Sequence, residues 1–191
     1  MFKTILAFFF LVAPVLAQDP AAASFAAAGC GPNEIQFDVK TDKKQHPLPQ
    51  PEPGKALVYV FEDKGGGFCI GGCITTRVGV DGAWVGANQG NSYLFFSVEP
   101  GEHRVCTAWQ SSLKGRSEVS AAITLTVEAG KVYYLRTSVG AEGPKRESKL
   151  EDEGFRLKLV DSANGPLKIQ PFAYSTSHPR KPAASGKTDS D

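Results

Sequence analysis

The sequence predicts an all-β protein, an antiparallel β-sandwich of about seven to nine short strands. Apolar and polar residues alternate with a period of two along several segments, most clearly over residues 119–128. Turn signals separate these segments, and the chain is rich in turn formers, with 20 glycines and 13 prolines. No segment shows the period of an amphipathic helix. This combination is typical of immunoglobulin- or prealbumin-like sandwiches with disordered tails.

Length and charge narrow the class of protein further. The 191 residues suit one domain with tails. The 21 Lys and Arg residues are balanced by 20 Asp and Glu. A nucleic-acid-binding protein usually carries a basic excess, so we expect no nucleic acid partner.

Residues 1–17 have the pattern of a secretory signal peptide. Lys3 is followed by the apolar run 5–16, and Ala17 is a small residue at the expected cleavage site. The run is too short for a membrane span, and no other stretch is long and apolar enough. We therefore expect an exported protein, periplasmic or secreted, with a flexible leader over residues 18–33.

Nine strands are predicted between this leader and the tail. The turns between them carry recognisable signals: Asp81-Gly82 is a two-residue hairpin signal, and Pro100-Gly101 fits a type II turn. The first strand is expected at a sheet edge, and the second, which is apolar throughout, at a sheet centre. The predicted strands are 34–40, 56–61, 75–80, 83–87, 93–98, 103–109, 119–127, 132–139 and 155–160.

The sandwich domain is predicted over residues 34–174. Within it, residues 45–54 hold four prolines in seven positions from Pro47, which predicts an extended strap rather than a sheet interior. Residues 175–191 have almost no apolar side chains, so we expect a disordered tail.

The four cysteines are expected to form disulfides, because the chain is predicted to be exported. Cys69 and Cys73 share a glycine-rich loop where close approach is easy, which leaves Cys30 to pair with Cys106. Two alternatives remain. A Cys-x3-Cys metal site would need ligands that the dispersed histidines do not supply nearby, so no metal is expected. The other alternative, acylation of Cys30, is less favoured, because the apolar run ends well before Ala28-Gly29-Cys30.

No catalytic motif emerges from the sequence, and we expect neither an enzyme nor a cofactor. The glycine-rich loop lacks the Gly-Lys-Ser/Thr of a phosphate-binding loop. Glu102 and His103 are strand neighbours, whose side chains point to opposite faces. The aromatic residues Trp84, Trp109 and Tyr93 are the candidate binding surface, because an exposed ring often marks a contact surface.

Several strand and turn motifs occur together in a recurring order. They are Ala-Leu-Val-Tyr-Val-Phe at 56–61, Val-Asp-Gly at 80–82, Pro-Gly-Glu-His at 100–103 and Tyr-Tyr-Leu-Arg at 133–136. As a set they resemble an uncharacterised bacterial envelope domain family, a domain of unknown function often found on lipoproteins. The resemblance implies a small exported β-sandwich without a known activity. This chain departs from it by lacking a lipobox at the cleavage site and by carrying Cys69 and Cys73 in an added loop.

The expected function is that of an exported, non-enzymatic β-sandwich of the bacterial cell envelope, a binding or structural module. Its partner would be an envelope protein or a glycan. Two alternatives stay open: an envelope hydrolase whose site is assembled only in the fold, and a lipid-anchored structural lipoprotein.

Overall fold

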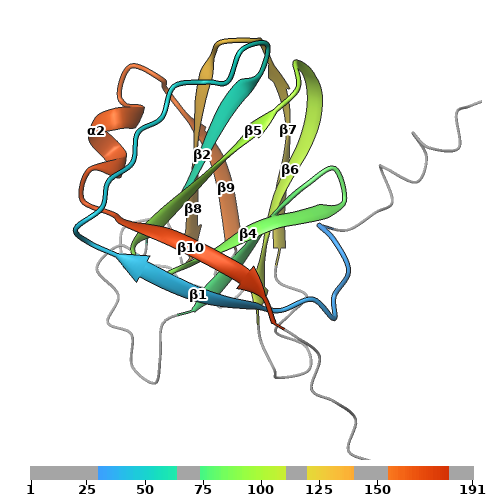
Figure 1. The fold of residues 1–191 in the computed structure, drawn as a ribbon. Helices are drawn as coiled ribbons and strands as arrows, with labels where there is room; N and C mark the ends of the chain where they lie inside the picture. Colours follow the sequence, from blue (N-terminus) through green and yellow to red (C-terminus); the bar gives the residue numbers. More distant parts are fainter. Residues whose placement is uncertain (1–29, 64–73, 111–119, 140–154, 181–191) are drawn as a thin grey trace, which may run out of the picture.

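Two β-sheets form the body of the protein in the computed structural model, which describes residues 30–63, 74–110, 120–139 and 155–180 (Figure 1). One sheet has six strands and the other four, and most neighbouring strands are antiparallel. The six-stranded sheet runs in the order β1 (Phe37–Asp42), β10 (Ala173–Pro179), β5 (Ser92–Val98), β2 (Ala56–Asp63), β8 (Val132–Val139) and β9 (Phe155–Val160). The four-stranded sheet runs in the order β4 (Ala83–Gln89), β3 (Thr75–Val80), β6 (Gly101–Gln110) and β7 (Ser120–Val127).

The main core lies between the two sheets, because alternate residues of each strand point toward the other layer. In β2, Val58 and Val60 face this core, and in β7 Leu125 and Val127 do the same. The predicted alternation over residues 119–128 is therefore confirmed wherever the structure describes it. The buried members are Ala56, Val58, Val60, Val78, Val80, Leu94, Val105, Leu125, Val127, Leu135 and Leu157.

A second cluster covers the opposite face of the six-stranded sheet, which explains why β2 is apolar throughout. Tyr59 and Phe61 point to this outer face, where the Tyr59 ring stacks on Tyr134 with centroids 5.1 Å apart. The short helix α2 (Gly165–Ile169) adds Ile169, and Phe172 packs against Phe61. In Figure 1, α2 lies at the left of the molecule, beside the segment that joins β1 to β2.

That joining segment contains the predicted strap, residues 45–54, which forms neither helix nor strand. The Tyr93 hydroxyl donates to the Pro47 carbonyl at 3.2 Å, and the Tyr59 hydroxyl donates to the Pro49 carbonyl at 3.4 Å. Burial raises the pKa of Tyr93 to about 12, so its phenol keeps the proton that it donates. The strap thus lies across the outer face, with its proline carbonyls serving as acceptors.

The all-β expectation is confirmed, with two mostly antiparallel sheets, but two details differ from the predicted antiparallel sandwich of about seven to nine strands. The described residues form ten strands, and two pairs, β2 with β8 and β5 with β10, are parallel. The nine predicted strands are all present; β3, β8 and β9 span the predicted residues, and the ends of most of the others are shifted. β1 lies at a sheet edge, as expected, although it spans Phe37–Asp42 rather than residues 34–40.

The additional strand β10 corrects the predicted boundary at residue 174. Residues 175–179 belong to β10 instead of a disordered tail, and they pair with β1 in antiparallel register. The inward side chains of this part of β10 are serines, which explains the absence of an apolar signal. The Ser175 hydroxyl donates to Ser92 Oγ at 2.7 Å, and Ser177 Oγ accepts the Ala87 amide at 2.9 Å. Hydroxyls satisfied in this way can be buried in place of apolar groups.

None of the helices among the described residues is long and apolar enough to cross a membrane. The predicted signal peptide (residues 1–17) and most of the predicted leader (18–33) lie outside those residues, which begin at Cys30.

Candidate functional site

The Cys30–Cys106 disulfide, predicted from the sequence, is confirmed, with its Cα atoms 5.5 Å apart. It attaches the N-terminal segment, residues 30–36, to β6 in the four-stranded sheet. A sulfur atom held in a disulfide cannot carry a lipid thioether, so this bridge and acylation of Cys30 exclude each other. The other predicted pair, Cys69 and Cys73, lies outside the described residues.

Arg77 of β3 is the second anchor of the N-terminal segment. Its side chain is only 1% exposed, and its Nη1 donates to the carbonyls of Asn33 and Ile35 at 3.1 and 2.8 Å. Its guanidinium lies over the Trp84 ring, 4.3 Å from the centroid, in a cation–π contact. Sequence reasoning missed this residue, because its hydrogen-bond partners are backbone carbonyls that leave no pattern in the sequence.

The three aromatic residues predicted as a binding surface do not form one. Trp84 is half-buried, and its indole Nε1 donates to the Pro32 carbonyl at 2.8 Å, so the ring contacts the N-terminal segment of its own chain. Trp109 is half-buried at the far end of β6. Tyr93 is fully buried under the strap, so its assignment to a surface is wrong. Trp84 and Tyr93 thus hold segments of their own chain, the N-terminal segment and the strap, against the sheets.

His103, near the start of β6, links the β3–β4 turn to the β5–β6 turn. Its Nδ1 lies 2.6 Å from Asp81 Oδ2 and its Nε2 lies 2.7 Å from the Glu99 carbonyl oxygen. Both of these oxygens are acceptors, so the two contacts favour the doubly protonated, charged form of the ring, in which both nitrogens donate. Burial opposes this charge, but the hydrogen bonds to Asp81 and Glu99 and the Asp81 charge outweigh it and raise the pKa of His103. With both nitrogens engaged, neither is available as a general base.

The free energy of unfolding should therefore depend on pH through His103. A folded-state pKa above the unfolded value of about 6.5 gives stability that is complete below that pH and is lost as pH rises through the folded pKa. We expect wild type to exceed Asp81→Asn in stability at pH 6, with the gap narrowing toward pH 9. Urea denaturation at a series of pH values measures this gap.

The Asp81→Asn variant is a suitable comparison because Asn tolerates the positive φ of 54° at this position. Its amide oxygen can still accept the Arg104 amide hydrogen that Asp81 Oδ1 accepts at 2.9 Å. A gap that stays constant between pH 6 and pH 9 would show that His103 does not carry the charge.

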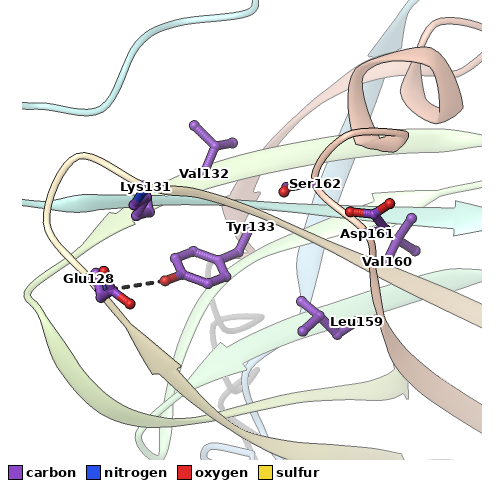
Figure 2. A pocket seen from close by; sticks show the side chains of 8 residues that line it. All are labelled: Glu128, Lys131, Val132, Tyr133, Leu159, Val160, Asp161 and Ser162. Atoms are coloured by element: carbon purple, nitrogen blue, oxygen red, sulfur yellow. Dashed lines mark hydrogen bonds between the residues drawn. The ribbon is translucent and has the colours of Figure 1, made fainter.

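A pocket of about 420 Å³ is the candidate binding site, and residues distant in sequence form it (Figure 2). One wall is the turn between β7 and β8, with the first residues of β8, and the other is the end of β9 with the residues after it. In Figure 2, Tyr133 and Leu159 lie between these walls. Leu159 is 55% exposed, so its apolar side chain is accessible to a bound molecule at the pocket. The lining residues are Glu128, Lys131, Val132, Tyr133, Leu159, Val160, Asp161 and Ser162.

Hydrogen bonds hold both walls of this pocket in place. The Glu128 amide donates to the Tyr133 hydroxyl oxygen at 3.0 Å, so the phenol hydrogen can still donate to a bound molecule. On the other wall, Asp161 Oδ1 accepts the Ala163 amide at 3.1 Å and Oδ2 accepts from Asn164 Nδ2 at 3.1 Å. The pocket therefore combines an apolar floor with a few fixed polar groups, as ligand sites commonly do.

A smaller pocket of about 220 Å³ lies beneath α2. The ion pair between Arg136 Nη2 and Asp63 Oδ2, at 3.0 Å, borders it, and Phe61 and Phe172 form its apolar side. Across the described part of the chain, no three His, Cys, Asp or Glu side chains are grouped so that they could hold a metal ion. The larger pocket is thus the better candidate, because the charged groups of the smaller pocket, Arg136 and Asp63, already form an ion pair with each other.

Sequence reasoning did not find this pocket. The strands that flank the Glu128–Lys131 turn were predicted, but the contact of this turn with the end of β9 depends on the antiparallel pairing of β8 with β9. The one available signal was Leu159, an apolar residue close to the end of an edge strand.

Comparisons with known proteins agree with the resemblance inferred from the motifs. Neither the curated proteins nor the solved structures contain a match. The model of one family, described as "Protein of unknown function (DUF2846)", matches residues 52–149, about half of the chain. The match spans β2 to β8, which includes the β7–β8 wall of the pocket and the contact between His103 and Asp81. The chain therefore belongs to DUF2846, a family of proteins of unknown function.

Proposed function

We propose that the protein is an exported, non-enzymatic binding module of the cell envelope that takes an apolar side chain of a partner protein into the pocket at Tyr133 and Leu159. The observation that carries this proposal is the pocket itself. Its volume of about 420 Å³ falls within the range of known ligand sites, ~300–1,000 Å³. Its apolar floor is exposed at Leu159, and burial of that side chain by a partner would favour association.

A protein partner is favoured over a glycan by the chemistry of the lining. Sugars are commonly held by exposed aromatic faces, and Tyr133 is the one aromatic residue in this pocket. The tryptophans that could have formed such a platform are half-buried, and Trp84 is engaged with Pro32. The remaining lining, Val132, Leu159 and Val160, suits an aliphatic side chain.

Export is supported by two independent observations. Residues 1–17 have the composition of a signal peptide, and the Cys30–Cys106 disulfide is of a kind that persists in oxidising compartments. The two face-to-face sheets are consistent with an immunoglobulin- or prealbumin-like sandwich, an architecture common among surface domains. A binding role is preferred to hydrolysis, because both nitrogens of His103 are engaged by acceptors.

Photo-crosslinking in cells that export the protein tests this proposal. A photoreactive phenylalanine analogue is placed at Leu159 in one variant and at Leu167 in a control. Leu167 is the matched control because it is 66% exposed, yet lies on α2 and does not line the pocket. We expect a discrete crosslinked protein from position 159 that is absent from position 167.

The intact mass of the purified chain tests export separately, and it should correspond to a start at Gln18.

The partner identified in this way is then titrated into the purified wild type and into Leu159→Asp. We expect binding to the wild type and a loss of about tenfold or more in affinity for the variant, because a charge replaces the apolar contact. Equal crosslinking from both positions, or equal affinity for both proteins, would contradict the proposed site. A mass that shows a lipid on Cys30 would contradict the soluble, disulfide-bonded form.

A further inference from the structure

The pocket lies at one end of the two sheets, here called the turn end, where the β3–β4, β5–β6 and β7–β8 turns meet the end of the strap. The β5–β6 and β7–β8 turns and the strap end are at the top of Figure 1. Carboxylates outnumber cations here: the described residues include six acidic side chains against three Lys or Arg. The acids are Glu52, Asp81, Glu99, Glu102, Glu128 and Asp161, and the bases are Lys55, Arg104 and Lys131, with His103 in addition.

Ion pairing within the turn end neutralises only part of its negative charge. Lys55 Nζ lies 2.9 Å from Glu52 Oε2 and 4.0 Å from Glu99 Oε1, so its charge is shared between two carboxylates. Lys131 forms no ion pair with any residue that the structure describes, and neither does Glu128. The pocket rim thus carries two carboxylates, Glu128 and Asp161, and one ammonium group.

The two carboxylates stand on opposite walls. Figure 2 shows Glu128 on one side of Tyr133 and Leu159, and Asp161 on the other side. The Asp161 carboxylate is held by its bonds to Ala163 and Asn164, so its position is fixed before a ligand binds. A ligand group that lies between the walls therefore meets apolar surface at its centre and a carboxylate at each end, with the Lys131 ammonium group on the Glu128 wall.

From this arrangement we infer that the partner segment is an extended chain with an apolar residue flanked by basic residues on both sides. The inference rests on the proposed function and deepens it. The apolar side chain packs between Tyr133 and Leu159, while the basic groups pair with Glu128 and Asp161. In an extended chain, residues two apart share one face and are separated by ~6.6–6.8 Å, so basic residues at both second neighbours face the same walls. Opposite charges at such a rim also speed the encounter.

Two peptides test the charge preference directly. The probe Ac-Lys-Ala-Leu-Ala-Lys-NH2 and its counterpart Ac-Glu-Ala-Leu-Ala-Glu-NH2 share the same central leucine. Their terminal residues carry opposite charges. Each is titrated into the 15N-labelled mature protein at low salt, and the amide shifts of Val132, Tyr133 and Leu159 are followed. We expect the basic peptide to shift these amides at several-fold lower concentration than the acidic one, with the difference reduced at high salt.

Charge variants connect this preference to the rim. Glu128→Gln should weaken binding of the basic peptide about two- to fivefold, in keeping with ~0.5–1 kcal/mol for an exposed ion pair, and Lys131→Gln should strengthen it. Glu34→Gln is the matched control: it removes the same charge from an exposed residue of the N-terminal segment, away from the pocket lining. Its affinity should equal that of the wild type.

The outcomes separate this inference from the proposed function. Equal binding of both peptides at the pocket would leave the site standing and overturn the basic flanks, as would a preference for the acidic peptide. If neither peptide shifts the pocket amides, the site itself is contradicted. A basic preference unaffected by Glu128→Gln would also overturn the assignment of that carboxylate.

Discussion

The Cys106→Ser variant is expected to lose about 4 kcal/mol of unfolding free energy, because its disulfide closes a long loop and removes much of the entropy of the unfolded chain. The bridged cysteines are 76 residues apart, and the bridge holds the N-terminal segment on β6. Urea denaturation of the oxidised wild type and of Cys106→Ser measures the loss. The Cys30→Ser variant should lose the same amount, since it removes the same bond.

Cys69→Ser provides the comparison, because the pair predicted for Cys69 and Cys73 would close only a very short loop and contribute about 2 kcal/mol. Peptide mapping without reductant reports both pairings. Cys30 joined to Cys69 or Cys73, or a stability that is the same for wild type and Cys106→Ser, would contradict the assignment.

Arg77→Met should destabilise the protein by about 3 kcal/mol, since the carbonyls of Asn33 and Ile35 would lose a buried, charged donor. The cation–π contact with Trp84 would be lost as well. Arg77→Lys should recover only part of this loss, because one ammonium group cannot reproduce the geometry of the guanidinium. Urea denaturation measures all three proteins.

Arg104→Met is the matched control, since Arg104 is exposed and its backbone, rather than its side chain, bonds to Asp81. We expect a change within about 0.5 kcal/mol for this variant. Hydrogen exchange adds a local measurement: Arg77→Met should speed exchange of the amides in residues 33–37. Losses of similar size for Arg77→Met and Arg104→Met would show that the N-terminal segment does not depend on Arg77.

Most strands could be predicted because their buried side chains are largely apolar, either at every second position or, in β2, throughout. β10 lacks this signal beyond Tyr174, because its inward side chains are serines whose hydroxyls are satisfied by Ser92 and by the Ala87 amide. The parallel pairing of β2 with β8 could not be predicted from the sequence either, because it depends on the order of the strands in the sheet and not on their composition.

The disulfide could be predicted by elimination from four cysteines, whereas the pocket and Arg77 could not. Tyr133 and Leu159 meet through the pairing of β8 with β9, and Arg77 acts on backbone carbonyls that any sequence would supply. The aromatic prediction failed for a related reason. An exposed tryptophan and one covered by its own N-terminal segment look alike in sequence, and the difference arises from the contact of Trp84 with Pro32.

The place of β10 between β1 and β5 has a consequence for how the chain reaches its final form. The Thr176 hydroxyl bonds to the Lys40 carbonyl, a contact between residues 136 positions apart. A sheet completed by such distant partners has high contact order and is expected to fold slowly, in milliseconds to seconds. During synthesis, β1 and the edge of β5 cannot pair with β10 until residue 179 has left the ribosome. A sheet that closes this late would keep the chain unfolded during the export that we propose, and stopped-flow refolding would show whether closure is that slow.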